Sequence, residues 1–234
     1  MTIDTDAAAT AMLAWLAAIG AGGADQLAGA CGLRPGVVRA RLRALEAAGL
    51  VRSDRLLHDM PALHTLTRRG LRAAGRTDLE PVAVSAAGFA HLYAVGEVAV
   101  ALGAGPHRLG GERDLRALER DAGHALASAE VGYGTDGAVA LHRPDLVCWG
   151  EGPPIAVEVE LTVKAPERLR TIVRGWARSR LVLGVVYYAS APAQRALERA
   201  IRAEDAEAAV AVLALERGGE LPPFRTARSI PSAA

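Results

Sequence analysis

The stretch HRPDLVCWGEGPPIAVEVELTVKAPERL, residues 142–169, decides the fold of the second half of the chain. It predicts a strand around 138–149, a turn at EGPP, a second strand at 155–163 and a helix at 166–179. The chain continues this alternation with a strand at 181–188, a helix at 192–203 and a strand at 209–215. Helices that alternate with apolar strands predict an α/β domain with a mixed sheet flanked by helices.

Two glutamates on the predicted strand 155–163 share one face. Side chains two apart in a strand point the same way, so Glu158 and Glu160 lie together and the neighbouring valines lie opposite. A buried carboxylate needs a partner and two neighbours repel each other, so the pair either reaches solvent or faces a cation. Asp145 is one short hairpin away. Three oxygen ligands on paired strands suit Mg²⁺ or Mn²⁺, and a solvated sheet face is the simpler alternative.

The order of Asp145, Glu158 and a following Lys resembles the PD-(D/E)xK nuclease superfamily. The resemblance implies a restriction-endonuclease-like domain built from a helix, a three-strand meander, a crossover helix and a fourth strand. It also implies that Asp145 and Glu158 hold Mg²⁺ or Mn²⁺, with Glu112 as the upstream helical acid. The family's catalytic Lys stands two residues after the Glu, where this chain has Glu160, and Lys164 follows four residues later. We expect Glu160 and Lys164 to share one strand face and to act on the attacking water.

The composition sets limits on the function. The chain has 234 residues, of which 51% are hydrophobic and 23% charged, and its net charge is +1. These values exclude wholesale disorder and a polybasic protein that is held to nucleic acid by its overall field. Cys31 and Cys148 stand far apart, which excludes a CxxC metal site and is typical of reduced thiols. His124 and His142 are candidate bases or ligands, but scattered histidines are more often structural.

Other signals predict where the protein works and what it does not bind. The glycine clusters fit no phosphate-binding loop, so no nucleotide cofactor is predicted. No export signal or membrane span is predicted, so we expect a cytoplasmic protein. The chain contains a single Lys, Lys164, among 27 basic residues. Its survival where the other 26 basic residues are all Arg directs attention to this position.

The first 76 residues predict three short helices and a β-hairpin. Residues 7–19 form the first helix, 25–30 the second, and Pro35 begins a third that runs to about Ala48. Two short strands, LVRSD and ALHTLT, enclose a tip, and RRGLRAAG forms a closing helix. The sequence resembles the winged helix-turn-helix family, notably in EAAGLV at 46–51 and HTLTRRGLRAAG at 64–75. This resemblance implies binding to double-stranded DNA.

The same segment is locally basic. Residues 25–76 carry ten Arg and four acidic side chains, an excess of six positive charges. We expect Arg34, Arg39 and Arg43 of the third helix to contact DNA, and Arg55 to reach a phosphate from an otherwise apolar wing tip. The alternative is a solvated basic face without a ligand.

We expect a winged-helix domain at 1–80, a nuclease-like domain at 81–220 and a tail at 221–234, with a long apolar helix at 85–104 that packs or joins the domains. The winged helix, the helix containing His91 and the string HRPDLV…IAVEVELTVKAPERL together resemble the replication-relaxation family of plasmid and conjugative-element proteins. This implies a DNA-binding protein of mobile-element replication or mobilisation with metal-dependent endonuclease or nicking activity. The alternative is a non-catalytic transcriptional regulator or relaxase accessory factor whose C-terminal domain forms a homodimer or binds a partner.

Overall fold

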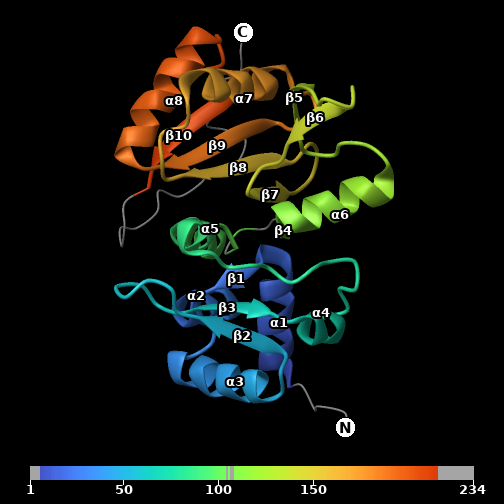
Figure 1. The fold of residues 1–234 in the computed structure, drawn as a ribbon, viewed down its shortest axis with the longest axis vertical. Coiled ribbons are helices and arrows are strands. Elements are labelled where there is room, and N and C mark those ends of the chain that lie inside the picture. The colour runs from blue at the N-terminus through green and yellow to red at the C-terminus, as the bar shows by residue number, and fades with distance from the viewer. Residues whose placement is uncertain (1–5, 104, 106–107, 216–234) are drawn as a thin grey trace. The chain divides into compact units, whose positions relative to one another are not determined.

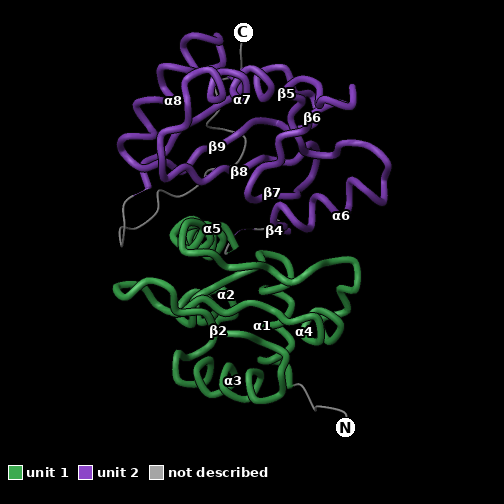
Figure 2. Tube along the Cα trace, in the orientation of Figure 1, with its two compact units in different colours: residues 1–104 green, residues 105–234 purple. Residues whose placement is uncertain are grey.

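The computed structural model describes residues 6–103, 105 and 108–215 of a mixed α+β chain. The chain divides into two compact units, residues 1–104 and 105–234 (Figures 1 and 2). The sequence had suggested a boundary at residues 80 and 81. The difference lies in helix α5 (Ala86–Gly103), which packs against α2 (Ala24–Cys31) and β1 (Ala21–Gly22) and so belongs to unit 1. The expected tail at 221–234 lies outside the described residues.

Unit 1 combines helices with a three-stranded antiparallel sheet of strand order β1-β3-β2. Its remaining elements are α1 (Ala7–Ile19), α3 (Pro35–Ala47), β2 (Val51–Asp54), β3 (Leu63–Leu66) and α4 (Arg68–Ala73). The helices and the hairpin lie where the sequence predicted them, and β1 is an addition. Its two residues follow Gly20 and pair with β3, a long-range contact that the glycine-rich local sequence does not indicate.

Helices α2 and α3 are joined by a tight turn. Gly32 ends α2 in the left-handed region, with φ of 63°, and Pro35 occupies the first turn of α3, where a missing N–H costs nothing. Val38, Leu42 and Leu45 are the buried positions of α3. Because they recur every three or four residues, the opposite side of α3 is left exposed.

Helix α5 closes the core of unit 1. Phe89 is fully buried in a cluster with Ala21 and Leu63 from the sheet. The Gln26 side chain of α2 accepts a hydrogen bond from Gly23 N and donates one to Tyr93 O of α5. Among the described residues α5 is the one helix long and apolar enough to cross a membrane by length and composition, and a buried core helix meets the same criteria. Seven of its 18 residues are buried.

Unit 2 is built on a five-stranded mixed sheet of order β10-β9-β8-β7-β4, with β5 and β6 forming a separate antiparallel hairpin. Strands β8, β9 and β10 are parallel, and β4 and β8 each run antiparallel to β7. The elements are β4 (Arg108–Gly111), α6 (Glu112–Ala122), β5 (Ala129–Tyr133), β6 (Val139–His142), β7 (Leu146–Trp149), β8 (Ile155–Glu160), α7 (Pro166–Arg178), β9 (Gly184–Ala189), α8 (Ala191–Ala203) and β10 (Val210–Ala214). Helices α7 and α8 pack on the same face of the sheet around Trp176, Tyr187 and Leu197.

Four local predictions for unit 2 are wrong. The strand expected at 138–149 is two strands, interrupted at Arg143–Asp145, where Pro144 has no N–H for a ladder. Strand β8 ends at Glu160 instead of 163. The sequence predicts a helix over 112–127 and a glycine-marked loop after it, whereas α6 ends at Ala122 and is followed by β5. The three adjacent antiparallel strands are β4, β7 and β8, and the first of them precedes α6 instead of following it.

Helix α4 is fixed to the sheet of unit 1 by a close backbone contact. Thr67 caps the helix, since its Oγ1 accepts from Gly70 N at 3.0 Å and donates to Gly49 O at 2.7 Å. A Cβ at Gly70 would lie 2.0 Å from the carbonyl oxygen of Leu50. Because that oxygen belongs to the main chain, it has no rotamer to move away.

We expect Gly70→Ala to lower the free energy of unfolding by about 1–3 kcal/mol, because the added methyl group overpacks a main-chain contact. Urea unfolding of the full chain measures this. Gly36→Ala is the matched control, since a Cβ there meets nothing within 4 Å on α3. Replacing this open helical glycine is expected to raise stability by about 0.5–1 kcal/mol. Equal stability of the two variants would contradict the packing described for α4.

Candidate functional site

The two carboxylates of β8 lie inside unit 2, not on a solvated face. Glu158 and Glu160 each expose only 6% of their surface. They share the side of β8 that carries Ala156, which is part of the core under α7 and α8. Across the sheet Glu158 is paired in register with Tyr187, and burial raises the pKa of that phenol well above its usual range. Each buried carboxylate therefore requires a partner in the protein.

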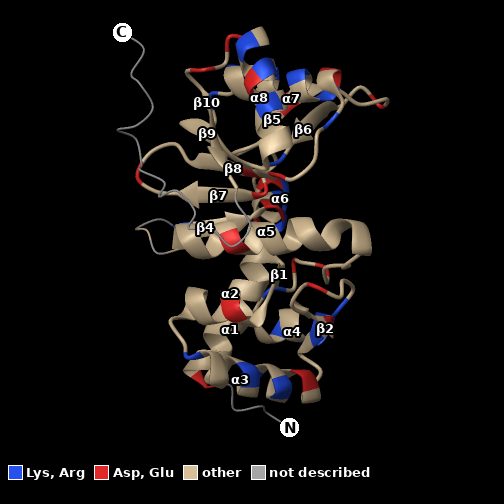
Figure 3. Ribbon diagram, turned by 90° about the vertical axis from the view of Figure 1, so that its left-hand side faces the viewer, with Lys and Arg blue, Asp and Glu red and all other residues tan. Residues whose placement is uncertain are grey.

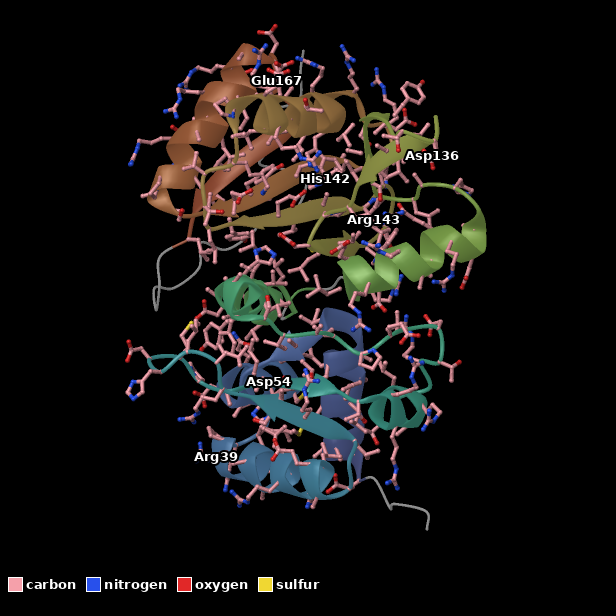
Figure 4. The ribbon with its side chains drawn as sticks, viewed as in Figure 1. Arg39, Asp54, Asp136, His142, Arg143 and Glu167 are labelled. Carbon is pink, nitrogen blue, oxygen red and sulfur yellow. The ribbon has the colours of Figure 1, made fainter. Side chains whose placement is uncertain are left out.

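Glu158 is partnered by a histidine. The Nε2 atom of His142, at the end of β6, lies 2.7 Å from Glu158 Oε1 (Figure 4 labels His142). The imidazole also meets the indole of Trp176 edge-on, with ring centroids 5.9 Å apart. Burial raises the pKa of the Glu158 carboxyl, whereas the His142 contact acts in the opposite direction and the nearby Asp145 charge adds to the rise. His142 thus holds Glu158 in place between the sheet and α7.

Glu160 is partnered by the only lysine. Lys164 forms an ion pair with Glu160 Oε2, and its side chain is 37% exposed. Because β8 ends at Glu160, Lys164 stands in the segment before α7 and not on a strand, which corrects the expected strand parity. Burial lowers the pKa of the Lys164 ammonium, while the charges of Glu158 and Asp145 act to raise it. The charges of both predicted metal ligands, Asp145 and Glu158, therefore act on the pKa of the Lys164 ammonium.

Asp145 joins the group from the start of β7. The next residue, Leu146, pairs with Val157, so Asp145 and Glu158 are neighbours across the two strands. The Asp145 Oδ2 atom accepts a hydrogen bond from Val159 N at 2.8 Å. The sequence prediction that these residues converge is consistent with this geometry, and each carboxylate also has a protein partner.

The Glu112 side chain pairs with Arg116 and not with the group formed by Asp145, Glu158, Glu160 and Lys164. The Glu112 N–H donates to the Asp145 carbonyl at 3.0 Å, but its half-exposed carboxylate accepts a hydrogen bond from Arg116 Nη2 at 2.5 Å. In the described part of the chain no group of three or more His, Cys, Asp or Glu side chains is arranged to hold a metal ion. Mg²⁺ is commonly held by one or two carboxylates with substrate phosphate and water, and Asp145 and Glu158 are the two that the sequence suggests for this role.

A further buried carboxylate, that of Glu119, was not predicted from the sequence. Glu119 of α6 is 4% exposed, and it accepts hydrogen bonds from Ser128 Oγ at 2.6 Å and from Arg143 Nε at 2.8 Å. Its Oε1 also accepts from Leu126 N at 3.0 Å. These contacts fix the turn into β5 and the segment before Asp145 (Figure 4 labels Arg143). No spacing pattern marks Glu119, since its partners come from separate segments.

The exposed side of α3 forms a basic surface in unit 1. Arg39 and Arg43 are four residues apart, so they project from one side of the helix, and both are exposed. Figure 4 labels Arg39, and Figure 3 colours the basic positions of α3 blue. Neither Arg39 nor Arg43 makes an ion pair among the described residues, whereas Arg41 pairs with Asp6. Arg34 is the exposed N-cap of α3, and Arg55 is exposed just after β2. All four residues predicted to bind DNA are therefore accessible.

Comparison with models of known protein families and with curated proteins finds no match. The basic side of α3 and the buried acidic group of unit 2 are therefore the basis for assigning a function. The basic side of α3 lacks carboxylate partners in the described residues, and the acidic group of unit 2 is internally paired.

We expect His142→Ala to lower the free energy of unfolding by about 1–3 kcal/mol, because it leaves the buried Glu158 carboxylate without its partner. Adding Glu158→Gln to this variant should recover part of the loss, because a neutral amide is cheaper to bury than a carboxylate. Urea titration at neutral pH measures both effects.

His124→Ala is the control, because that ring is exposed and contacts only the adjacent Ala125 carbonyl. Its effect should stay within about 0.5 kcal/mol. A His142→Ala variant as stable as this control would show that the His142 contact does not support Glu158.

Proposed function

We propose that the protein binds double-stranded DNA through α3. The observation that carries this proposal is the pair Arg39 and Arg43, exposed on one side of α3 without a carboxylate partner in the described residues. Free guanidinium groups on an exposed helix suit phosphate oxygens and the acceptor edge of guanine. The overall charge of +1 means that this attraction is local to unit 1.

The topology of unit 1 supports the proposal. Its order α1-β1-α2-α3-β2-β3 and its sheet order β1-β3-β2 agree with a winged helix-turn-helix plan. In helix-turn-helix proteins the second helix of the pair lies in the major groove, and here that helix is α3. The segment between β2 and β3 carries Arg55, which is exposed and positioned as a wing residue.

We expect Arg39→Ala and Arg43→Ala each to weaken duplex binding, by about 1–3 kcal/mol for a residue that reads a guanine edge. A residue that contacts only phosphate should instead reduce the salt slope by about 0.9 per lost contact and leave sequence preference unchanged. Fluorescence anisotropy with a labelled duplex, measured over a salt series, distinguishes the two kinds of contact.

Arg41→Ala is the matched control on the same helix, because Arg41 already pairs with Asp6. It should weaken binding less than either of the other two changes. Wild-type affinity in both Arg39→Ala and Arg43→Ala at low salt would overturn the role proposed for α3.

A second candidate function is metal-dependent nicking of DNA by unit 2. The observation that favours it is the convergence of Asp145, Glu158, Glu160 and Lys164 at the ends of β7 and β8. We propose that Asp145 and Glu158 hold one Mg²⁺ or Mn²⁺, which when bound would lower the pKa of a water and stabilise charge on the phosphorus centre. Glu160 orients the Lys164 ammonium, which can hold the attacking water by donating a hydrogen bond. The parallel strands β8 and β9, joined by the crossover helix α7, support the last part of a PD-(D/E)xK-like plan, whereas β4 precedes α6 and departs from it.

We expect wild-type protein with Mn²⁺ to nick supercoiled plasmid and Asp145→Ala to lose this activity. Lys164→Arg should lose most of it, because a planar guanidinium on a longer stem cannot replace a compact ammonium. Agarose gel separation of nicked and supercoiled plasmid is the readout, with metal chelation as the parallel control. Equal cleavage by wild type and Lys164→Arg would refute the role of the ammonium.

Absence of cleavage by wild type would favour the non-catalytic alternative. In that case the protein is a transcriptional regulator or a relaxase accessory factor, and unit 2 provides a surface for dimerisation or partner binding. In either case we propose a cytoplasmic role in replication or mobilisation of a mobile element, on the strength of the resemblance to the replication-relaxation family.

A further inference from the structure

A pocket in unit 2 lies away from the β8 carboxylates, between the β5–β6 hairpin and the end of α7. Its volume is ≈ 440 Å³. The side chains that matter are contributed by β5 (Glu130 and Tyr133) and by the end of α7 and the segment after it (Arg178, Ser179 and Arg180). We propose that this pocket binds one nucleotide of a single strand of nucleic acid, with Tyr133 stacking on the base and the two arginines contacting phosphate.

The pocket has a rigid floor. Helix α7 packs on β5 at Gly175, where a Cβ would lie only 2.6 Å from the Glu130 carbonyl oxygen. Gly175 is buried, and it lines the pocket together with Gly132. The missing Cβ of Gly175 lets α7 approach β5 closely, and the exposed Gly132 contributes only backbone to the lining. A volume of this size lies within the range of about 300–1,000 Å³ typical of small-ligand sites.

Tyr133 has the properties of a stacking platform. It lines the pocket, yet it is 79% exposed, the most of any large hydrophobic side chain in the described residues. Its cross-strand partner Val139 is also exposed, at 45%, so the ring does not pack into a core. Base–aromatic stacking tolerates any sequence because every base has a π-face.

The charges of the pocket favour a phosphodiester. Arg178 and Arg180 are exposed and make no ion pair among the described residues, and Glu130 is the single carboxylate of the lining. The Ser179 Oγ atom accepts a hydrogen bond from Leu181 N at 3.3 Å, which leaves its proton to donate to a phosphate oxygen. The Glu130 carboxylate can accept a hydrogen bond from the N3–H group of a thymine or uracil base. This combination of an aromatic ring with two free arginines matches single-stranded nucleic acid.

The inference goes beyond duplex binding by α3 and uses none of its residues. The test is fluorescence anisotropy of the full chain with three labelled ten-nucleotide probes: oligodeoxythymidine, oligouridine and an abasic DNA strand of the same charge. Tyr133→Ala should weaken binding of the first two at least about fivefold and leave the abasic strand unaffected. Tyr133→Phe should bind as wild type does, because stacking needs only the ring.

The double variant Arg178→Ala and Arg180→Ala should weaken binding of all three strands and reduce the salt slope by about 0.7 per lost phosphate contact. Arg202→Ala, an exposed change on α8, is the control and should have no effect. Tighter binding of the DNA or of the RNA oligomer identifies the source of the strand.

Duplex binding separates this proposal from that for α3. Tyr133→Ala should bind duplex as wild type does. Arg43→Ala should still bind the base-containing single strands more tightly than the abasic strand. Equal affinities of wild type and Tyr133→Ala for oligodeoxythymidine and for oligouridine, with unchanged thermal unfolding, would overturn the proposal. So would a wild type that binds the abasic strand as tightly as the base-containing strands.

Discussion

Burial of two carboxylates on the central strand of unit 2 constrains everything packed around it. Glu158 and Glu160 cannot remain inside the protein without partners, so His142 is held at the end of β6 and Lys164 in the segment before α7. Helix α7 begins two residues after Lys164, at Pro166, and packs on β5 at Gly175. The acidic group and the pocket beside β5 are thus connected through α7.

Glu204 and Glu160 are paired with different kinds of cation. The Glu204 carboxylate accepts hydrogen bonds from Arg170 Nε at 2.7 Å and from Arg174 Nε at 2.6 Å, and these contacts lower the pKa of its carboxyl. Glu160 instead pairs with the only lysine of the chain. An ammonium loses its proton more readily on burial than a guanidinium, and burial does lower the pKa of Lys164. The two arginines join α7 to Glu204 at the end of α8, whereas the Lys164 ammonium lies beside the acidic group at the end of β8.

The two units present positive charge in different settings. On α3 the free guanidinium groups extend along an exposed helix, which suits the regular phosphate spacing of a duplex. In the pocket beside β5 two arginines flank an exposed tyrosine, which suits an unpaired base and its phosphate. The net charge of +1 does not indicate either basic surface, because acidic residues elsewhere in the chain balance their positive charges.

Sequence alone determined the features that depend on local periodicity. These are the helices of unit 1, the exposed side of α3 with Arg39 and Arg43, and the shared face of Glu158 and Glu160. Tertiary structure decided the features that depend on long-range pairing: β4, the contact of His142 with Glu158, and the assignment of α5 to unit 1. It also ended β8 before Lys164 and brought Tyr133 beside the end of α7. A helical or strand repeat is set by neighbours within a few residues, whereas a buried charge finds its partner only when distant segments pack together.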